Sequence, residues 1–222
     1  MGRKKISDEA RNHIVTNFLR CTRKIQEQEG FDQVSTRKVA GYAGFTSTNI
    51  YLYFHDLDEM LMLAGMASWE SCFRALDAAP ASGPGSGQAY LDCWRILGQH
   101  SFRSPAYFFH FFFTAHGLPV PEMIHRYYTE IYPELPAASD GTALRMERAS
   151  DPRTLLLRHF LPLCRRAGIP DADAAVLNEF LFSYFRTLLE QAVQAPGDAS
   201  FQQRQAQLLH AAELLLCRIA VK

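Results

Sequence analysis

Residues 34–54 read VSTRKVAGYAGFTSTNIYLYF, and this stretch decides the fold. Ser35 is a good N-cap, and the apolar residues after it recur at helical spacing, which predicts a short first helix. Gly44 falls where that helix should end, because glycine readily adopts the left-handed conformation found at helix C-termini. A tight turn and a second helix should follow, with Phe45 as the buried residue of the turn.

The second helix should begin at Thr46 or Ser47, either of which is a suitable cap. Ile50 and Phe54 then form an apolar pair one helical turn apart, which gives this helix a face for the core. The opposite face carries mostly hydrogen-bonding side chains. A small helix, a glycine turn and a second helix with a free polar face are the parts of a helix-turn-helix that docks in a DNA groove.

The charge pattern favours the same interpretation. Residues 33–55 contain no Asp or Glu, whereas Arg37 and Lys38 are basic, and residues 1–24 hold seven Lys or Arg against two acids. Duplex DNA is a dense line of negative charge, so a docking surface should exclude carboxylates. The formal net charge of the chain is +0, so nucleic-acid binding must rest on this local charge. The alternative is an ordinary helical hairpin with a solvated face.

Residues 6–64 resemble the DNA-binding domain of the TetR family of transcriptional regulators. The matching segments are GF at 30–31, STRKVA at 35–40, AGF at 43–45, YLYF at 51–54 and DEML at 58–61. Two departures concern the DNA contacts. Leu57 stands where the family commonly has a lysine that reaches a phosphate, and Ser47-Thr48 replaces a frequent Lys-Gly at the start of the recognition helix.

The resemblance implies a set of DNA contacts. Thr36 and Tyr51 are expected to bond phosphates, a role that extends to His55, while the other members should lie toward the groove. The full predicted set is Thr36, Arg37, Thr46, Ser47, Thr48, Asn49, Tyr51, Tyr53 and His55.

The rest of the chain also shows helical patterns and no convincing strand. Helices are predicted over residues 8–29, 57–76, 88–101, from 105, and over 121–132, 151–167, 171–195 and 200–221, with loops at 80–87 and 133–150. The fold class is therefore all-α: a three-helix DNA-binding domain over residues 1–56 and a larger helical effector-binding and dimerisation domain over 57–222.

The segment 107–113, YFFHFFF, is apolar on nearly every side. Such a helix is either packed in a core or forms the wall of an apolar ligand cavity, and the sequence leaves both open. The resemblance favours a cavity, because TetR-type regulators bind small effectors in the C-terminal domain. A small hydrophobic or aromatic effector is expected, and the candidate lining residues are Trp94, Tyr107, Phe108, His110, Phe111, Phe112, Thr114 and Tyr128.

Residues 171–195 carry two adjacent apolar stripes, too wide for one partner helix. One stripe is expected inside the protomer and the other against a second copy, in a dimeric four-helix bundle. The predicted interface residues are Leu177, Leu181, Phe185, Leu189, Leu208 and Leu215. An internal helix sandwich is the alternative. A homodimer would read two half-sites of a pseudo-palindromic duplex operator.

Several classes of protein lack support in the sequence. No apolar run is long enough to span a bilayer, and the five cysteines are scattered without CxxC spacing, which indicates reduced thiols in the cytoplasm. No cluster of Cys and His has zinc spacing, and GxSxG, GxGxxG and phosphate-loop motifs are missing, so no metal, cofactor or enzymatic activity is predicted.

The predicted function is ligand-responsive transcriptional regulation, and the resemblance implies repression that an effector relieves. Two alternatives from other classes stay open. One is a helical enzyme that uses the aromatic cavity as its active site, and the other is a helix-turn-helix that serves only as a protein-interaction module. Salt-dependent binding to duplex DNA would argue against both.

Overall fold

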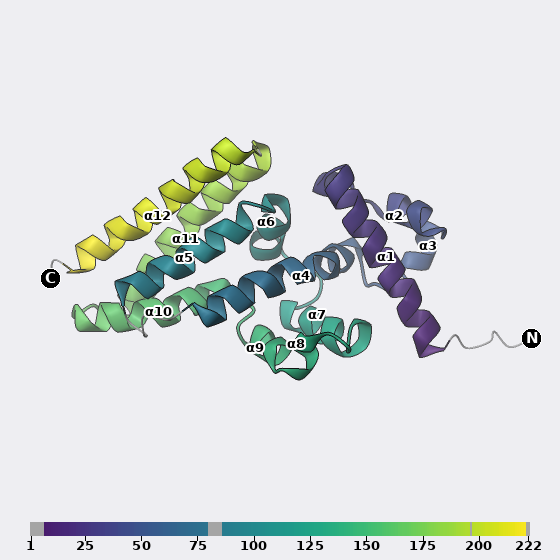
Figure 1. Cartoon of the computed structure of the whole chain (residues 1–222), viewed down its shortest axis with the longest axis horizontal. Helices are drawn as coiled ribbons and strands as arrows, with labels where there is room; N and C mark the ends of the chain where they lie inside the picture. Colours follow the sequence, from purple (N-terminus) through teal and green to yellow (C-terminus); the bar gives the residue numbers. More distant parts are fainter. Residues whose placement is uncertain (1–6, 80–85, 196, 221–222) are drawn as a thin grey trace, which may run out of the picture. The chain divides into compact units, whose positions relative to one another are not determined.

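The computed structural model describes residues 7–79, 86–195 and 197–220 (Figure 1). Every regular element among these residues is a helix, which confirms the all-α prediction. The basic residues Arg3, Lys4 and Lys5 lie outside the described residues, as does most of the predicted loop at 80–87.

The chain divides into two compact units. The first comprises Met1–Ala67 and Ala115–Ser150, and the second comprises Ser68–Thr114 and Asp151–Lys222. Helix α4 (Leu57–Ala78) begins in the first unit and ends in the second. Packing thus groups residues 115–150 with the N-terminal helices, while the functional boundary after residue 56 stays a prediction.

The N-terminal part of the first unit contains α1 (Asp8–Gln28), η1 (Phe31–Gln33), α2 (Thr36–Ala43) and α3 (Ser47–Ile50). Helix α1 begins where predicted, because the Ser7 hydroxyl accepts a hydrogen bond from the Ala10 N–H at 3.2 Å. Its buried side chains pack with those of the two short helices. The fully buried residues at this core are Phe18, Leu19, Ile25, Val39 and Ile50.

The C-terminal part of the first unit contains α7 (Val120–Arg126), the π-helical turn η2 (Tyr127–Ile131), α8 (Pro136–Ser139) and α9 (Thr142–Arg148). The predicted loop at 133–150 is therefore wrong. Pro136 occupies the first turn of α8, where proline is well tolerated, and Gly141 adopts a φ of 78° immediately before α9. Residues that suggested a loop are helix starts, and the buried Met146 fixes α9 to its neighbours.

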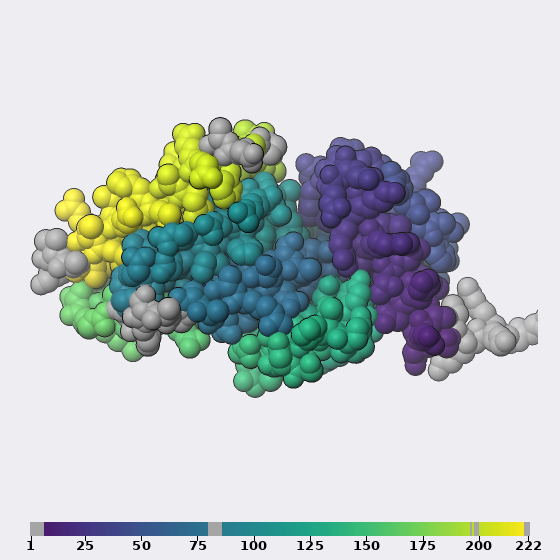
Figure 2. Space-filling model, viewed as in Figure 1, coloured from purple at the N-terminus to yellow at the C-terminus, as the bar shows by residue number. Residues whose placement is uncertain are grey.

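The second unit contains the end of α4 together with α5 (Gly87–Ser101), α6 (Pro105–Phe113), α10 (Pro152–Arg166), α11 (Asp171–Gln194) and α12 (Asp198–Ala220). Helix α5 packs against α10 and α12, and α11 packs against α6, α10 and α12. Helix α12, yellow in Figure 2, forms part of the outer surface of this unit. These helix boundaries confirm the predicted ones to within a few residues.

The described helices include none that is long and apolar enough to cross a membrane. All five cysteines are free, and four of them are buried. Burial raises the pKa of the Cys93 thiol to about 12 and that of the Cys164 thiol to about 11, so both stay protonated at neutral pH.

Candidate functional site

The turn between α2 and α3 has the cap and the glycine conformation that the sequence predicts, but Phe45, predicted to be buried, is only half-buried. The Ser35 hydroxyl accepts a hydrogen bond from the Lys38 N–H at 3.3 Å and caps α2. Gly44 ends the helix in the left-handed conformation, with a φ of 79°. The Phe45 N–H then donates to the Ala40 carbonyl at 2.9 Å, which closes the turn. Local chemistry alone therefore specifies this turn.

Helix α3 is shorter than predicted. It ends at Ile50, and the chain leaves it in a loose turn in which the N–H groups of Tyr53 and Phe54 both donate to the Ile50 carbonyl, at 2.9 and 3.0 Å. Phe54 is nevertheless 2% exposed, so the predicted pair with Ile50 does face the core. Tyr53 and Phe54 are both buried in the turn that follows the helix.

Most of the predicted DNA contacts lie on an accessible face. Arg37, Thr46, Thr48, Tyr51 and His55 are exposed. Thr36, Ser47 and Asn49 are half-buried, and Asn49 accepts a hydrogen bond from the Thr46 hydroxyl. This face carries hydroxyl, amide and guanidinium groups and no carboxylate from residues 33–55, which suits a polyanionic partner.

Tyr53 does not belong to this face. Its side chain is only 7% exposed, and its ring lies 6.0 Å from the ring of Phe18. The guanidinium of Arg11 also lies over this ring, 5.2 Å from its centroid. Tyr53 is therefore a core residue of the first unit, and the prediction that it faces the groove is corrected.

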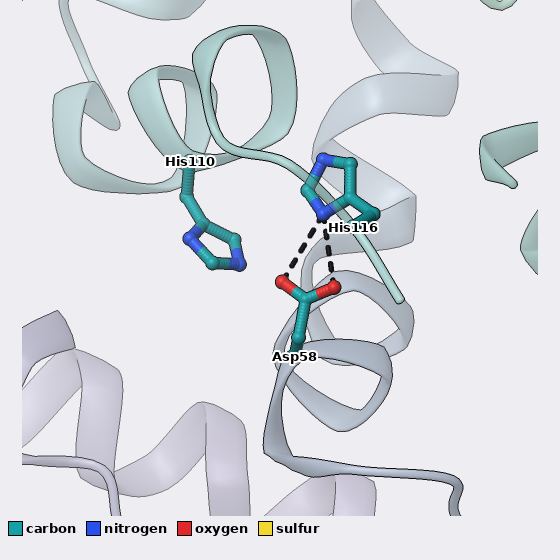
Figure 3. A group of neighbouring side chains, drawn as sticks. All are labelled: Asp58, His110 and His116. Carbon is teal, nitrogen blue, oxygen red and sulfur yellow. Dashed lines mark hydrogen bonds and ion pairs between the residues drawn. The ribbon is translucent and has the colours of Figure 1, made fainter. Parts of the chain in front are cut away.

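Two carboxylates at the start of α4, those of Asp56 and Asp58, contact histidines. Asp56 also caps the helix: one of its oxygens accepts the Glu59 N–H at 2.8 Å, and the other lies 2.9 Å from Nδ1 of His55. Asp58 contacts Nδ1 of His116 at 3.0 Å (Figure 3). The His116 side chain is 8% exposed, so this pair ties the segment before α7 to the start of α4.

The predicted ligand-pocket residues fall in both units. Trp94, Tyr107, Phe108 and Phe111 are buried in the second unit, whereas Thr114 is exposed. Their rings contact other rings closely: Trp69 and Phe111 have centroids 4.9 Å apart, and Trp69 and Phe112 are 5.7 Å apart. This contact is what core packing requires. An entering effector would have to part these rings.

His110 and Tyr128 complete that predicted set. His110 is half-buried in α6 of the second unit. Tyr128 belongs to η2 of the first unit, where its hydroxyl lies 3.9 Å from Sδ of Met146 and its ring 4.9 Å from that of Tyr127. Tyr128 therefore belongs to the first unit, whereas the other predicted lining residues belong to the second.

The predicted dimer residues divide between core and surface. Leu181, Phe185, Leu189 and Leu208 are 0–5% exposed within one protomer and therefore pack inside the second unit. The exposed apolar side chains lie beside them: Phe180 is 69% exposed, and Val176, Tyr184 and Leu214 are also exposed. A groove of about 220 Å³ runs along this surface, lined by Leu177, Phe180, Leu181, Tyr184, Ala211 and Leu215.

The sequence showed both stripes of α11, but periodicity does not say which one faces inward. The inner stripe packs on α5 and α6, since Trp94 and Phe185 have ring centroids 6.0 Å apart. The outward face of α11 leaves Val176, Phe180 and Tyr184 exposed, and contiguous exposed apolar patches can mark interaction sites.

No protein-family model matches the sequence, and no curated protein matches it. Solved structures do. RolR in complex with its ligand resorcinol has a TM-score of 0.51 at 17% identity, covering 94% of this chain and 96% of RolR. A transcriptional regulator from Rhodococcus sp. Rha1 has a TM-score of 0.50 at 16% identity, covering 92% and 95%.

A TetR family transcription regulator from Marinobacter aquaeolei VT8 has a TM-score of 0.44 at 17% identity, covering 92% of this chain and 98% of that one. The first two similarities span nearly the whole of both chains, so they show that this chain shares the all-helical fold of these two proteins. The fold expected from the sequence resemblance is thereby confirmed.

Proposed function

We propose that this chain is a TetR-type transcriptional regulator that binds duplex DNA through the face formed by α2 and α3. The observation that carries this proposal is the exposed face around Arg37 and Tyr51, to which residues 33–55 contribute no carboxylate, on a helix-turn-helix whose first helix is capped by Ser35. The shared fold with known regulators supports it. In this docking, Thr36, Tyr51 and His55 hold phosphates, while Arg37, Ser47, Thr48 and Asn49 meet base edges.

The proposed regulator acts as a homodimer. A single helix-turn-helix reads one half-site, and two copies related by a two-fold axis read a pseudo-palindromic operator with half-sites about 34–36 Å apart. The exposed apolar surface of α11 and α12 is the candidate interface, since burying it against its copy removes its contact with water.

A small hydrophobic or aromatic effector releases the protein from DNA in this scheme, so the protein represses in the cytoplasm until the effector arrives. The effector must bind the non-DNA-binding conformation more tightly, because only differential affinity shifts a conformational equilibrium. The aromatic cluster of α4 and α6, in which the Trp69 ring meets those of Phe111 and Phe112, is the proposed receptor. The resorcinol bound by the similarly folded RolR indicates a small aromatic molecule as the first probe.

The test begins with selection of duplexes from a random library by the full-length protein. The selected duplex should bind with an affinity that falls steeply with salt, with a log–log slope of about 0.9 per neutralised phosphate. Adding resorcinol or a related small aromatic to the complex then tests release. Binding that is insensitive to salt, or no preference for duplex over unrelated polyanions, would rule out the proposed function.

A further inference from the structure

Arg126, at the end of α7, contacts the segment that follows the recognition helix. One guanidinium nitrogen donates to the Glu59 carboxylate, and the other terminal nitrogen donates to the Tyr53 carbonyl at 2.6 Å. The guanidinium also lies over the ring of Phe54, 5.6 Å from its centroid. The Arg126 side chain therefore contacts two successive residues after α3, namely Tyr53 and Phe54.

Glu59 completes this contact from the other side. Its carboxylate is 1% exposed and also accepts the His55 N–H at 2.6 Å. A buried carboxylate needs a cationic or hydrogen-bonding partner, and Arg126 is the cation that reaches it. Arg126 also lies 3.5 Å from Glu130, but that side chain is 67% exposed, so the pair contributes little.

Two further contacts fix the same helical segment to α1. The side-chain amide of Asn12 donates to the Ile131 carbonyl at 3.0 Å, and Arg23 donates to the Tyr132 hydroxyl at 3.0 Å. Between these contacts and Arg126 lies the π-helical turn, in which the Tyr132 N–H bonds the Tyr127 carbonyl at 2.9 Å. This π turn is the last turn of the helix, which ends at Ile131.

We propose that Arg126 is a positioning residue for DNA binding: it holds residues 51–56, and with them Tyr51 and His55, in the conformation that meets the phosphates. The effect on DNA affinity rests on the proposed function, whereas the positioning of residues 51–56 does not. Arg126 contacts the chain after α3 from the middle of residues 120–132, and Asn12 and Arg23 of α1 bond the end of that segment at Ile131 and Tyr132. Residues 126–132 therefore connect α1 to the end of α3.

The substitution Arg126→Lys distinguishes the effect of the guanidinium's two hydrogen bonds from the effect of its positive charge. Lysine keeps a positive charge beside Glu59, but its single ammonium lacks the planar fork that reaches the carboxylate and the Tyr53 carbonyl together. In amide hydrogen exchange without DNA, the peptide spanning residues 51–56 should exchange about tenfold faster, as expected for losing a charge-assisted hydrogen bond. Arg148→Lys, an exposed change in α9 of the same unit, is the control and should match the wild type.

Unchanged exchange at residues 51–56, or an equal increase along all of α1, would overturn the positioning role. If Arg126→Lys does not fold, the neutral pair Arg126→Gln with Glu59→Gln replaces it, because that pair leaves no buried charge unpaired. The same local increase in exchange is expected, and its absence is equally decisive.

The DNA measurement follows with the selected duplex. Arg126→Lys should weaken binding about tenfold with base preference retained, since phosphate contacts position the protein without specifying sequence. Faster exchange with unchanged affinity would overturn the link to DNA. A wild-type protein that does not bind duplex DNA would refute the proposed function, while the exchange result would still decide the structural role of Arg126.

Discussion

His159 is an imidazole that the second unit keeps almost out of contact with water. Its side chain is 6% exposed in α10. Burial, reinforced by the charge of Arg158, lowers the pKa of His159 below its ordinary value. The neutral form is therefore the one that the folded state accommodates.

This burial predicts a sensitivity to acid. The unfolded chain binds a proton with a pKa of about 6.5, and the folded state binds it only at lower pH, so stability is complete above about pH 6.5 and falls as the pH drops below it. His159→Gln should flatten the fall in melting temperature between about pH 7 and 5. His125→Gln, with a side chain 62% exposed, is the control. Equal acid sensitivity in wild type and His159→Gln would contradict this account.

Residues whose role is local were predictable, and those whose role depends on distant partners were not. Ser35 and Gly44 follow from capping and left-handed turn chemistry within a few residues. Tyr53 was misplaced because Phe18 and Arg11 bury it, and both are more than 30 positions away in sequence. The pairing of Glu59 with Arg126 joins residues 67 positions apart, and no local pattern marks it.

At the scale of elements, the α2–turn–α3 unit depends on one backbone conformation. Gly44 has a φ of 79°, and no atom lies within 4 Å of the position that a Cβ would take. An alanine there meets no neighbour, so its cost is the strain of the left-handed region alone. Gly41 lies inside α2 with the same open space and no positive φ.

Alanine substitutions at the two glycines should therefore change the free energy of unfolding in opposite directions. Gly44→Ala should lower the free energy of unfolding by about 1–2 kcal/mol, because alanine is strained in the left-handed conformation. Gly41→Ala should raise it by about 0.5–1 kcal/mol, because alanine loses less backbone entropy in a helix. Denaturant titration of both variants measures the difference. Destabilisation of equal size by both would contradict this account, because only Gly44 has a positive φ and neither position has a neighbour for a Cβ to meet.

For helix α11, periodicity identified the two apolar stripes but could not say which of them faces the core. The double stripe was visible in the sequence, but the choice of inward face was set by rings on other helices, including Trp94. The helices at 136–148 were missed for a related reason. Proline and glycine mark helix starts as well as loops, and only the burial of side chains such as Met146 distinguishes the two.

For the whole molecule, we expect two copies of the chain to associate through α11 and α12, because Val176, Phe180, Tyr184 and Leu214 leave an apolar surface exposed there. Phe180→Lys with Tyr184→Lys should give a folded monomer, because both side chains are exposed in the protomer and only a dimer would bury their charges. Sedimentation of wild type and variant at micromolar concentration measures this. The control is Glu190→Lys, an exposed charge change on the same helix. A wild-type monomer would contradict the dimer.

The central claim is that the α2–α3 face binds duplex DNA, and Arg37→Ala tests it most directly. The measurement is the affinity of full-length protein for the selected duplex and for its single-base variants, beside Arg148→Ala as an exposed control in the same unit. Arg37→Ala should cost about 1–3 kcal/mol and relax preference at one base pair, as expected for an arginine on a guanine edge. Unchanged affinity and unchanged base preference in Arg37→Ala would contradict the claim.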